Sequence, residues 1–214
     1  MKFAFGKKSG DTAGQVDFSR LPRHIAIILD GNGRWAKRRG LPRTAGHKVG
    51  AETFRTIATY CRDIGIEYLT VYAFSTENWK RPRDEVDTIM VLLKRYLLEA
   101  IETMERDNVR LRFMGDMSPL NDELKGLVEK CNAISSRLSG CLCSICINYG
   151  GRAELVHAAE RFAEDCRLGL VKPDSLTEEV LSGYLYSAGI PGPELLIRPG
   201  GEQRLSNFLL CQCA

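Results

Sequence analysis

Residues 24–40 read HIAIILDGNGRWAKRRG, and the fold is best interpreted from this stretch. It begins with a short apolar run, typical of a buried strand, that ends at Asp30. Two glycines then bracket Asn32, and no acidic side chain occurs between Gly31 and Ala51. The same interval carries a dense group of cations, namely Arg34, Lys37, Arg38, Arg39, Arg43 and Lys48. One carboxylate at a strand end, with glycine backbone and positive charge beside it, predicts a site for an anion and a metal ion.

The bulk composition limits the class of protein. A chain of 214 residues with 44% hydrophobic and 27% charged residues is typical of one globular domain, or at most two. The net charge of +3 is too small to indicate a nucleic-acid partner. No apolar run approaches the ~20 residues of a membrane-spanning helix, and the N-terminus lacks the apolar segment of a secretory signal. We therefore expect a cytoplasmic protein with a flexible leader over residues 1–20 and one domain over residues 21–214.

Eight cysteines raise the alternatives of disulfides or a zinc site. No CxxC pair repeats at the spacing of a zinc finger. In a strand over residues 141–149, Cys141 and Cys143 would share one face while Cys146 points to the other, which is poor geometry for one metal. We expect reduced cysteines that pack as small hydrophobes in the core.

The chain alternates between strand and helix patterns. Apolar, β-branched and aromatic runs predict strands over residues 24–30, 67–74, 109–114, 141–149 and 194–198. Apolar residues at three- and four-residue steps predict helices over residues 46–64, 86–104, 120–138, 153–168 and 177–187. This alternation predicts an α/β domain with a mostly parallel central sheet flanked by helices. In such sheets, ligands bind beyond the carboxyl ends of the strands.

Small, polar and basic residues follow four of the predicted strands. They are Asp30 to Arg34; Ser75 to Trp79 with Arg81; Gly150, Gly151 and Arg152; and Arg198, Gly200, Gly201, Arg204 and Ser206. Glycine lets backbone amides approach an anion closely, and arginine can donate two hydrogen bonds to phosphate oxygens. Asp30 suits Mg²⁺, which typically takes one or two carboxylates together with substrate phosphate oxygens. The strand ends therefore predict a diphosphate site with its metal.

Each signal has an ordinary alternative when it is taken alone. DGNG is typical of a tight turn, KRR of a solvated helix face, and Trp35, Trp79 and His47 of packing residues. Their coincidence at the strand ends favours the functional interpretation. Leu92, Leu98 and the segment CLCSICI (141–147) fit either core packing or the wall of an apolar sleeve.

Four longer motifs extend this interpretation: HIAIILDGNGRWAKRRGLPRTAGHKVGA, YAFSTENWKRP, NYGGR and LLIRPGGEQRLSNFLL. Together they resemble the cis-prenyltransferases, especially the bacterial undecaprenyl diphosphate synthases, from about residue 21 to the last residue. The resemblance implies a homodimeric, Mg²⁺-dependent enzyme with an apolar tunnel, which condenses farnesyl diphosphate with successive isopentenyl diphosphates. The implied product is a cis-polyprenyl diphosphate, the precursor of a cell-wall lipid carrier, made at the inner face of the membrane. A nucleotide-binding module would instead require a GxxxxGK[ST] loop or a ribose-binding acid, and the sequence shows neither.

The resemblance also implies roles for individual residues. Asp30 would bind Mg²⁺ and serve in catalysis together with Asn78, the residue assigned as proton acceptor. The allylic diphosphate would be held by Gly31, Asn32, Gly33, Arg34, Arg43 and His47, with Trp35 beside it. The substrate site would further comprise Ser75, Thr76, Glu77, Trp79 and Arg81. Isopentenyl diphosphate would be held by Arg198, Arg204 and Ser206, and Leu205 would also belong to the substrate site.

Two features depart from the family pattern. Pro199 stands where the family carries a small hydroxyl residue, and it removes one backbone N–H beside Arg198. The sequence ends at CQCA, whereas the family carries a tryptophan in place of Cys211 and about one more helix, with a glutamate of the Mg²⁺ site. These departures favour weak activity, and they leave open a non-catalytic, cis-prenyltransferase-like subunit that binds isoprenoid diphosphate and a partner. The retention of Asp30, Asn32, Arg34 and Asn78 favours the enzyme.

Overall fold

The computed structural model describes residues 17–214, and at its centre lies a five-stranded sheet in which all neighbouring strands run parallel. The strand order is β3-β4-β2-β1-β5. The strands are β1 (His24–Ile28), β2 (Tyr68–Ser75), β3 (Arg110–Met114), β4 (Leu142–Tyr149) and β5 (Leu195–Ile197). The predicted α/β class is confirmed, and parallel pairing brings the carboxyl ends of the strands to one edge of the sheet.

Alternating side chains divide the packing of the sheet between its two faces. In β1, Ile25 and Ile27 belong to the core cluster that includes the helix residues, whereas Ala26 and Ile28 belong to a second cluster. All residues of β1 are buried because this strand lies between β2 and β5 with both faces covered. The continuous apolar run in the sequence is thus the signature of a central parallel strand.

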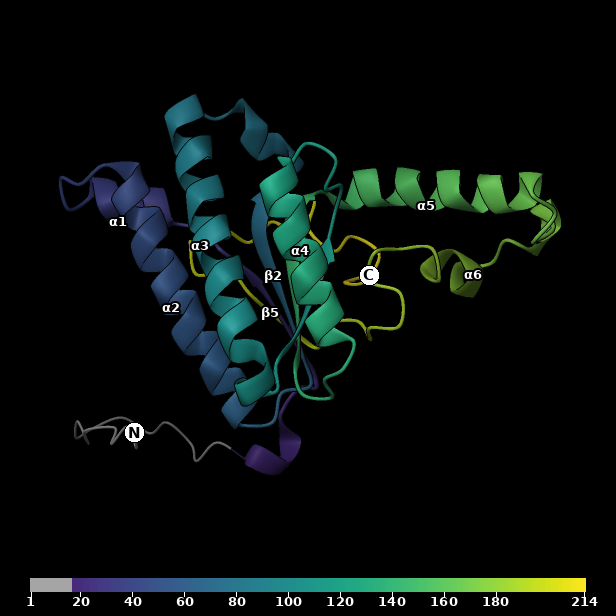
Figure 1. The fold of residues 1–214 in the computed structure, drawn as a ribbon, viewed down its shortest axis with the longest axis horizontal. Helices are drawn as coiled ribbons and strands as arrows, with labels where there is room; N and C mark the ends of the chain where they lie inside the picture. Colours follow the sequence, from purple (N-terminus) through teal and green to yellow (C-terminus); the bar gives the residue numbers. More distant parts are fainter. Residues whose placement is uncertain (1–16) are drawn as a thin grey trace.

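Three long helices cover one face of the sheet (Figure 1). Along one of them Val86, Leu97 and Met104 are buried, at spacings that place them on the same side of the helix. The three helices are α2 (Arg43–Asp63), α3 (Arg83–Asp107) and α4 (Asp122–Ser135). Since α2 and α3 lie side by side over the sheet, they and the sheet enclose the space in which the candidate site is found.

The second core cluster includes the last segment of the chain. Phe208 and Leu209 are fully buried, and the ring of Phe208 stacks on Tyr72 with 4.7 Å between centroids. Two further helices, α5 (Gly151–Arg167) and the short α6 (Glu178–Ser182), project away from the sheet (Figure 1). The buried carboxylate of Glu154 accepts hydrogen bonds from the Tyr149 hydroxyl (2.5 Å) and from the backbone N–H of Tyr186 (3.0 Å). These bonds tie the projecting part to the sheet.

Besides two three-residue 3-10 turns, η1 (Phe18–Arg20) and η3 (Pro173–Ser175), the structure differs from the sequence prediction in three elements. A six-residue helix, α1 (Asn32–Lys37), follows Gly31 and was not predicted. A 3-10 turn, η2 (Thr76–Lys80), directly follows β2. The helix predicted over residues 177–187 is wrong in length: α6 ends at Ser182, Gly183 forms its C-cap, and turns follow. The other predicted helices and strands are present, with their ends shifted by a few residues.

The cysteine prediction is confirmed only for part of the set. All eight cysteines are free, and Cys61, Cys131, Cys143 and Cys146 are buried, but Cys211 is exposed. Within the predicted leader, Phe18–Arg20 forms a short 3-10 turn, and residues 1–16 lie outside the described residues.

Alanine at Gly46, in the contact between α1 and α2, and alanine at Gly126 in α4 should have opposite effects on stability. A Cβ at Gly46 would lie 2.0 Å from the carbonyl oxygen of Asn32, so Gly46→Ala should force the helices apart and lower the free energy of unfolding. Overpacking of this kind costs about 1–3 kcal/mol. Gly126→Ala is the matched control, because a Cβ there meets nothing within 4 Å and alanine favours a helix by up to ~1 kcal/mol. Urea unfolding measures both, and a Gly46→Ala protein as stable as the wild type would contradict the observed approach of the helices.

Candidate active site

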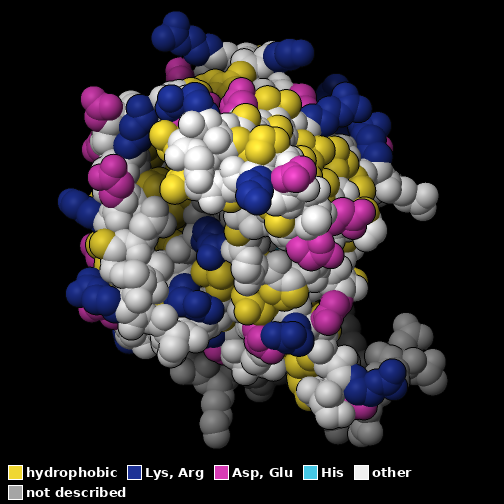
Figure 2. Space-filling model, turned by 90° about the vertical axis from the view of Figure 1, so that its right-hand side faces the viewer, with side chains coloured by type: hydrophobic (Ala, Val, Ile, Leu, Met, Phe, Trp, Pro, Cys, Tyr) yellow, Lys and Arg dark blue, Asp and Glu magenta, His cyan; other side chains and the backbone are white. Residues whose placement is uncertain are grey.

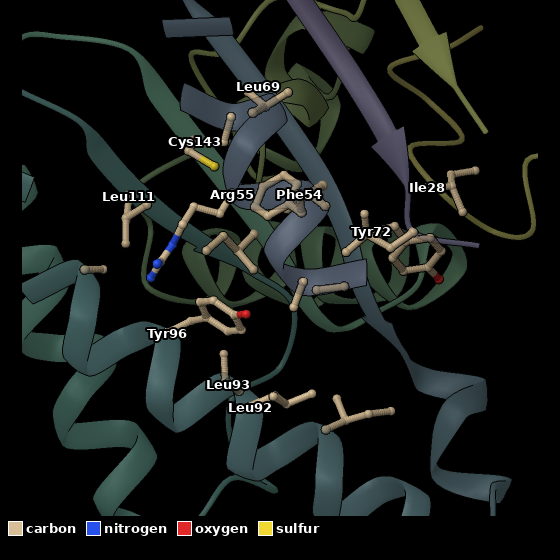
Figure 3. Close-up of a pocket in the computed structure, with 18 of the residues that line it drawn as sticks. Ile28, Phe54, Arg55, Leu69, Tyr72, Leu92, Leu93, Tyr96, Leu111 and Cys143 are labelled. Carbon is tan, nitrogen blue, oxygen red and sulfur yellow. The ribbon is translucent and has the colours of Figure 1, made fainter. Parts of the chain in front are cut away.

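A cavity of about 1170 Å³ lies between α2, α3 and the sheet. Its interior is mostly apolar: Phe54 comes from α2, Leu69 from β2, and Leu92 and Leu93 from α3 (Figure 3). Leu98, the other leucine considered for a sleeve, is 45% exposed and does not line the cavity. The predicted second wall is present and contributes Cys141, Cys143 and Ile145.

Charged side chains interrupt this apolar lining, among them the pairs Arg55 with Glu99 and Arg62 with Asp107. Arg55 of α2 and Glu99 of α3 both line the cavity and form an ion pair between the two helices. The guanidinium of Arg55 also lies 5.6 Å from the ring centroid of Tyr96, and both side chains are visible in Figure 3. The contact between α2 and α3 at the cavity wall is therefore stabilised by an ion pair as well as by apolar packing.

At the carboxyl ends of the strands, the lining of the cavity changes from apolar to polar. The polar side chains come from the segments that follow β1, β2 and β5, and from the first turns of α2. The sequence-predicted site residues on this lining are Asp30, Asn32, His47, Ser75, Glu77, Asn78, Arg81, Arg198, Arg204 and Ser206. The cavity therefore joins a polar mouth to an apolar interior, as expected where parallel strand ends meet.

Asp30 connects the end of β1 with the segment that follows β5. Its Oδ2 accepts hydrogen bonds from Nε and Nη2 of Arg198, at 3.1 and 2.9 Å, and from Nη2 of Arg34 at 3.2 Å. Its Oδ1 accepts a hydrogen bond from the Gly31 backbone at 2.6 Å. Burial acts to raise the pKa of Asp30, but the hydrogen bonds from Arg198 and Gly31 and the arginine charges lower it overall. Asp30 is therefore an ionised acceptor at neutral pH.

A second carboxylate at the mouth, that of Glu85, contacts several basic side chains. The sequence analysis did not identify this residue. It lies in the first turn of α3, and its side chain is only 4% exposed. The carboxylate lies 3.0 Å from Nε2 of His47, accepts a hydrogen bond from Arg81 at 2.9 Å and pairs with Nε of Arg43 at 3.0 Å. Burial acts to raise the pKa of Glu85, but the His47 hydrogen bond and the charges of Arg81 and Arg43 lower it overall. His47 and Arg43, two of the residues predicted to bind the diphosphate, are thus oriented by the buried carboxylate of Glu85.

The turn after β2 orients Asn78. The Ser75 backbone N–H donates to Oδ1 of Asn78 at 3.1 Å, and the Ser75 side chain accepts from the Asn78 backbone, which forms a capping box. The neighbouring Trp79 donates its indole N–H to Asn148 at 2.8 Å and packs edge-on against Phe74. Asn78 therefore lies on the cavity lining in a fixed orientation, whereas Trp79 lies beside it and does not line the cavity.

The remaining predicted residues surround the mouth without lining it. Trp35, for example, lies beneath the guanidinium of Arg39, 4.3 Å from the ring centroid. The full set is Gly31, Gly33, Arg34, Trp35, Arg43, Thr76, Trp79 and Leu205. Conversely, Asn207 lines the cavity but was not predicted to, and Arg152 also lines it, although the sequence analysis named it only as a strand-end residue without a role of its own. Asn207 stands inside a quoted motif beside Ser206, and that position is the signal that could have identified it.

The mouth offers a donor set that fits one mode of Mg²⁺ binding. Within residues 17–214, no three His, Cys, Asp or Glu side chains gather in a metal-binding group. Mg²⁺ commonly binds through one or two carboxylates, with waters and substrate phosphates as its other ligands. Asp30 is such a carboxylate, so a metal ion would arrive with a diphosphate and compete with Arg198 for Oδ2.

Comparisons with known proteins assign this geometry to a family. Residues 28–214 match the family model described as "Putative undecaprenyl diphosphate synthase". The chain belongs to the undecaprenyl diphosphate synthase family of cis-prenyltransferases. The isoprenyl transferase of Heliobacterium mobile is 50% identical over 200 residues, covering 94% of this chain and 77% of the relative. That of Clostridium perfringens is 45% identical over 212 residues, covering 98% and 84%.

Solved structures agree with this assignment. Lavandulyl diphosphate synthase from Lavandula x intermedia, solved with dimethylallyl diphosphate, matches with a TM-score of 0.84 and 34% identity, covering 89% of this chain and 83% of that one. A probable undecaprenyl diphosphate synthase from Campylobacter jejuni matches with a TM-score of 0.73 and 35% identity, covering 91% and 83%. The family resemblance and the fold expected from the motifs are both confirmed.

The buried position of Glu85 predicts a measurable pH dependence of stability. Because its pKa is lowered in the folded state, Glu85 stabilises the fold above its ordinary pKa of about 4.3, and this contribution is lost as the pH falls through the folded value. Glu85→Gln should lower the free energy of unfolding at pH 7 by about 1.5–3 kcal/mol, the range for hydrogen bonds to charged groups. Urea unfolding from pH 7 down to below pH 4 should show this difference shrinking. Asp87→Asn, on the exposed side of α3, is the control, and a constant gap for Glu85→Gln would contradict the assignment.

Proposed function

We propose that this member of the family elongates farnesyl diphosphate with successive isopentenyl diphosphates and makes a cis-polyprenyl diphosphate, the precursor of a lipid carrier. One observation supports this most directly: the polar mouth and the apolar interior belong to one continuous cavity of about 1170 Å³. A diphosphate head needs charge-assisted donors, whereas a growing hydrocarbon chain needs apolar surface. A ligand with both parts matches the cavity along its whole length.

The reaction places distinct demands on the residues of the mouth. The double bond of isopentenyl diphosphate attacks the allylic carbon, the allylic C–O bond breaks with its electron pair going to the diphosphate, and a proton then leaves the added unit. Asn32, Arg34, Arg43 and His47 would hold the departing diphosphate, and fixed donors of this kind stabilise developing charge. Mg²⁺ held by Asp30 would further neutralise that charge. Asn78 is our candidate for receiving or relaying the proton, because its amide lines the cavity in a fixed orientation.

The second diphosphate would be held by Arg198, Arg204 and Ser206 on the segment after β5, with Leu205 also in the substrate site. Arg198 supports this, since its side chain is only 10% exposed and already donates to Ser206 at 2.7 Å. In the structure Arg198 also neutralises Asp30, so incoming phosphate oxygens and a metal would redistribute these contacts. The retained Asp30 and Asn78 support catalysis over the alternative of a non-catalytic subunit.

A second copy of the chain is the protein partner that we propose. The side of the molecule that carries α5 and α6 exposes hydrophobic side chains between charged ones (Figure 2). The exposed apolar residues of this region include Val156, Leu168, Leu170 and Leu176. Within residues 17–214, none of the helices is both long and apolar enough to cross a membrane. We propose a homodimer that forms through this apolar surface, lies in the cytoplasm and contacts the inner face of the membrane through its lipid product.

The proposed function is tested directly with purified protein. Incubation with farnesyl diphosphate, labelled isopentenyl diphosphate and Mg²⁺ should give a ladder of labelled products that lengthens with time. Omission of Mg²⁺, or addition of a chelator, should stop the reaction. Calorimetric binding of farnesyl diphosphate without any elongation, across a Mg²⁺ titration, would instead favour the non-catalytic subunit.

The role of Asp30 gives a second test. Asp30→Asn removes the carboxylate that would hold a metal beside Gly31, so turnover should fall by about 10²–10³, as is typical when one charge-stabilising element is lost. Circular dichroism should change little because Asp30 lies at a strand end. Arg38→Ala, an exposed cation in the same stretch, is the control and should keep near wild-type turnover. Normal rates for Asp30→Asn at all Mg²⁺ concentrations would show that the metal is bound elsewhere.

A further inference from the structure

Asn207 joins three segments that are far apart in the sequence. Its side-chain Nδ2 donates to Oε1 of Glu77 at 3.0 Å, in the turn after β2. Its side-chain Oδ1 accepts a hydrogen bond from the backbone N–H of Arg152 at 2.9 Å, and its carbonyl oxygen accepts one from Gly151 at 2.7 Å, both at the start of α5. Each hydrogen-bonding group of the side chain therefore holds a different strand-end segment.

The backbone around Asn207 holds it in this position. Ser206 and Asn207 both adopt left-handed conformations, with φ of 52° and 63°, which non-glycine residues rarely adopt. The next residue, Phe208, is fully buried and stacks on Tyr72. The tight turn is thus held between a core anchor on one side and the Asn207 hydrogen bonds on the other, and asparagine is among the residues that tolerate this conformation best.

The opposing segment is shaped to receive the Asn207 side chain. A Cβ at Gly150 would lie 2.5 Å from Nδ2 of Asn207 and 3.0 Å from Oγ1 of Thr76, so only glycine permits this approach. Glu77 is suited to act as the acceptor. Burial acts to raise the pKa of Glu77, but hydrogen bonds, including the one from Asn207, lower it overall and keep the carboxylate ionised. The bond between Glu77 and Asn207 is therefore charge-assisted, which makes it stronger than a bond between neutral groups.

We propose that Asn207 is a positioning residue for the second diphosphate site, and this inference rests on the proposed function. Ser206, its direct neighbour, accepts a hydrogen bond from Arg198 at 2.7 Å, and Arg198 also donates to the Arg204 carbonyl. When the Glu77 bond is broken, the turn at residues 206–207 loses one of its restraints. Ser206 then loses its fixed position, and Arg198, although still held by Asp30, loses the hydrogen bond that it donates to Ser206. Asn32 and His47 at the allylic site keep their positions. The expected effect is a selective loss of affinity for isopentenyl diphosphate.

A reversal of the hydrogen bond tests this inference. Asn207→Asp turns the donor toward Glu77 into an acceptor and sets two carboxylates against each other. The KM for isopentenyl diphosphate should rise roughly tenfold or more, as expected for a lost charge-assisted bond, with little change in the KM for the allylic diphosphate. The double variant Glu77→Gln with Asn207→Asp restores one donor and one carboxylate in exchanged positions. Its KM for isopentenyl diphosphate should return to within about threefold of that of Glu77→Gln alone.

The control separates positioning from charge. Gln203→Glu adds the same negative charge to an exposed position of the same segment, and it should leave the KM for isopentenyl diphosphate within about twofold. If the double variant is no better than Asn207→Asp, the residue does not act through Glu77, and a direct contact with the substrate replaces our inference. Equal increases in both KM values would also overturn it, because they indicate a general loosening of the mouth.

A failure of the proposed function remains distinguishable from a failure of this inference. If the wild-type protein shows no turnover, the proposed function fails, and the same four variants are compared by calorimetric binding of isopentenyl diphosphate. Urea unfolding of each variant gives the coupling between residues 77 and 207 without any substrate. Coupling in stability together with unchanged isopentenyl diphosphate binding would show a purely structural role and would overturn the inference.

Discussion

The ion pair between Asp30 and Arg198 is the interaction on which the arrangement of the mouth depends. β5 has only three residues and lies at the edge of the sheet, so its own backbone pairing with β1 holds the following segment weakly. Arg198, directly after β5, reaches Oδ2 of Asp30 at 2.9 Å and Ser206 at 2.7 Å. The contact between Asp30 and Arg198 therefore fixes the segment after β5, which the few backbone hydrogen bonds of so short a strand would leave weakly held.

The cavity separates two environments that one amphipathic ligand needs. Polar groups at the mouth have fixed partners: His47 is oriented by Glu85, and Asn78 by the Ser75 backbone. The interior is lined by apolar side chains such as Phe54 and Leu92. Contact between them and a hydrocarbon chain releases water, which favours binding, but it is not directional and fixes no ligand atom in one place. A head group can therefore be held in register while a hydrocarbon chain of changing length slides against the wall. Repeated addition of units at one site requires this division.

The sequence predicted the sheet well because its signals are local. An apolar run such as residues 24–30 identifies a central parallel strand, and the residues after each strand end are known once the sheet is assumed. Helix α1 was missed because its six residues carry no apolar periodicity and begin in a motif that equally forms a turn. Glu85 was missed for a different reason: its partners His47 and Arg43 come from another helix, and no spacing in the sequence reveals such a contact. Leu98 shows the same limit, since an apolar pattern does not tell which side of α3 faces the cavity.

The long-range polar contacts explain how loops without regular structure can form a defined site. Asp30 with Arg198, Glu85 with His47, and Glu77 with Asn207 each join segments that are separated by at least 38 residues in the chain. Bringing such distant segments together costs conformational entropy, and the formation of the sheet and helices has already offset this cost. The side-chain bonds then need only select one arrangement among those that the scaffold allows. Substitutions at Asp30 or Asn207 should therefore alter ligand binding more than they alter the fold, whereas substitutions of the buried Glu85 should also lower the stability of the fold.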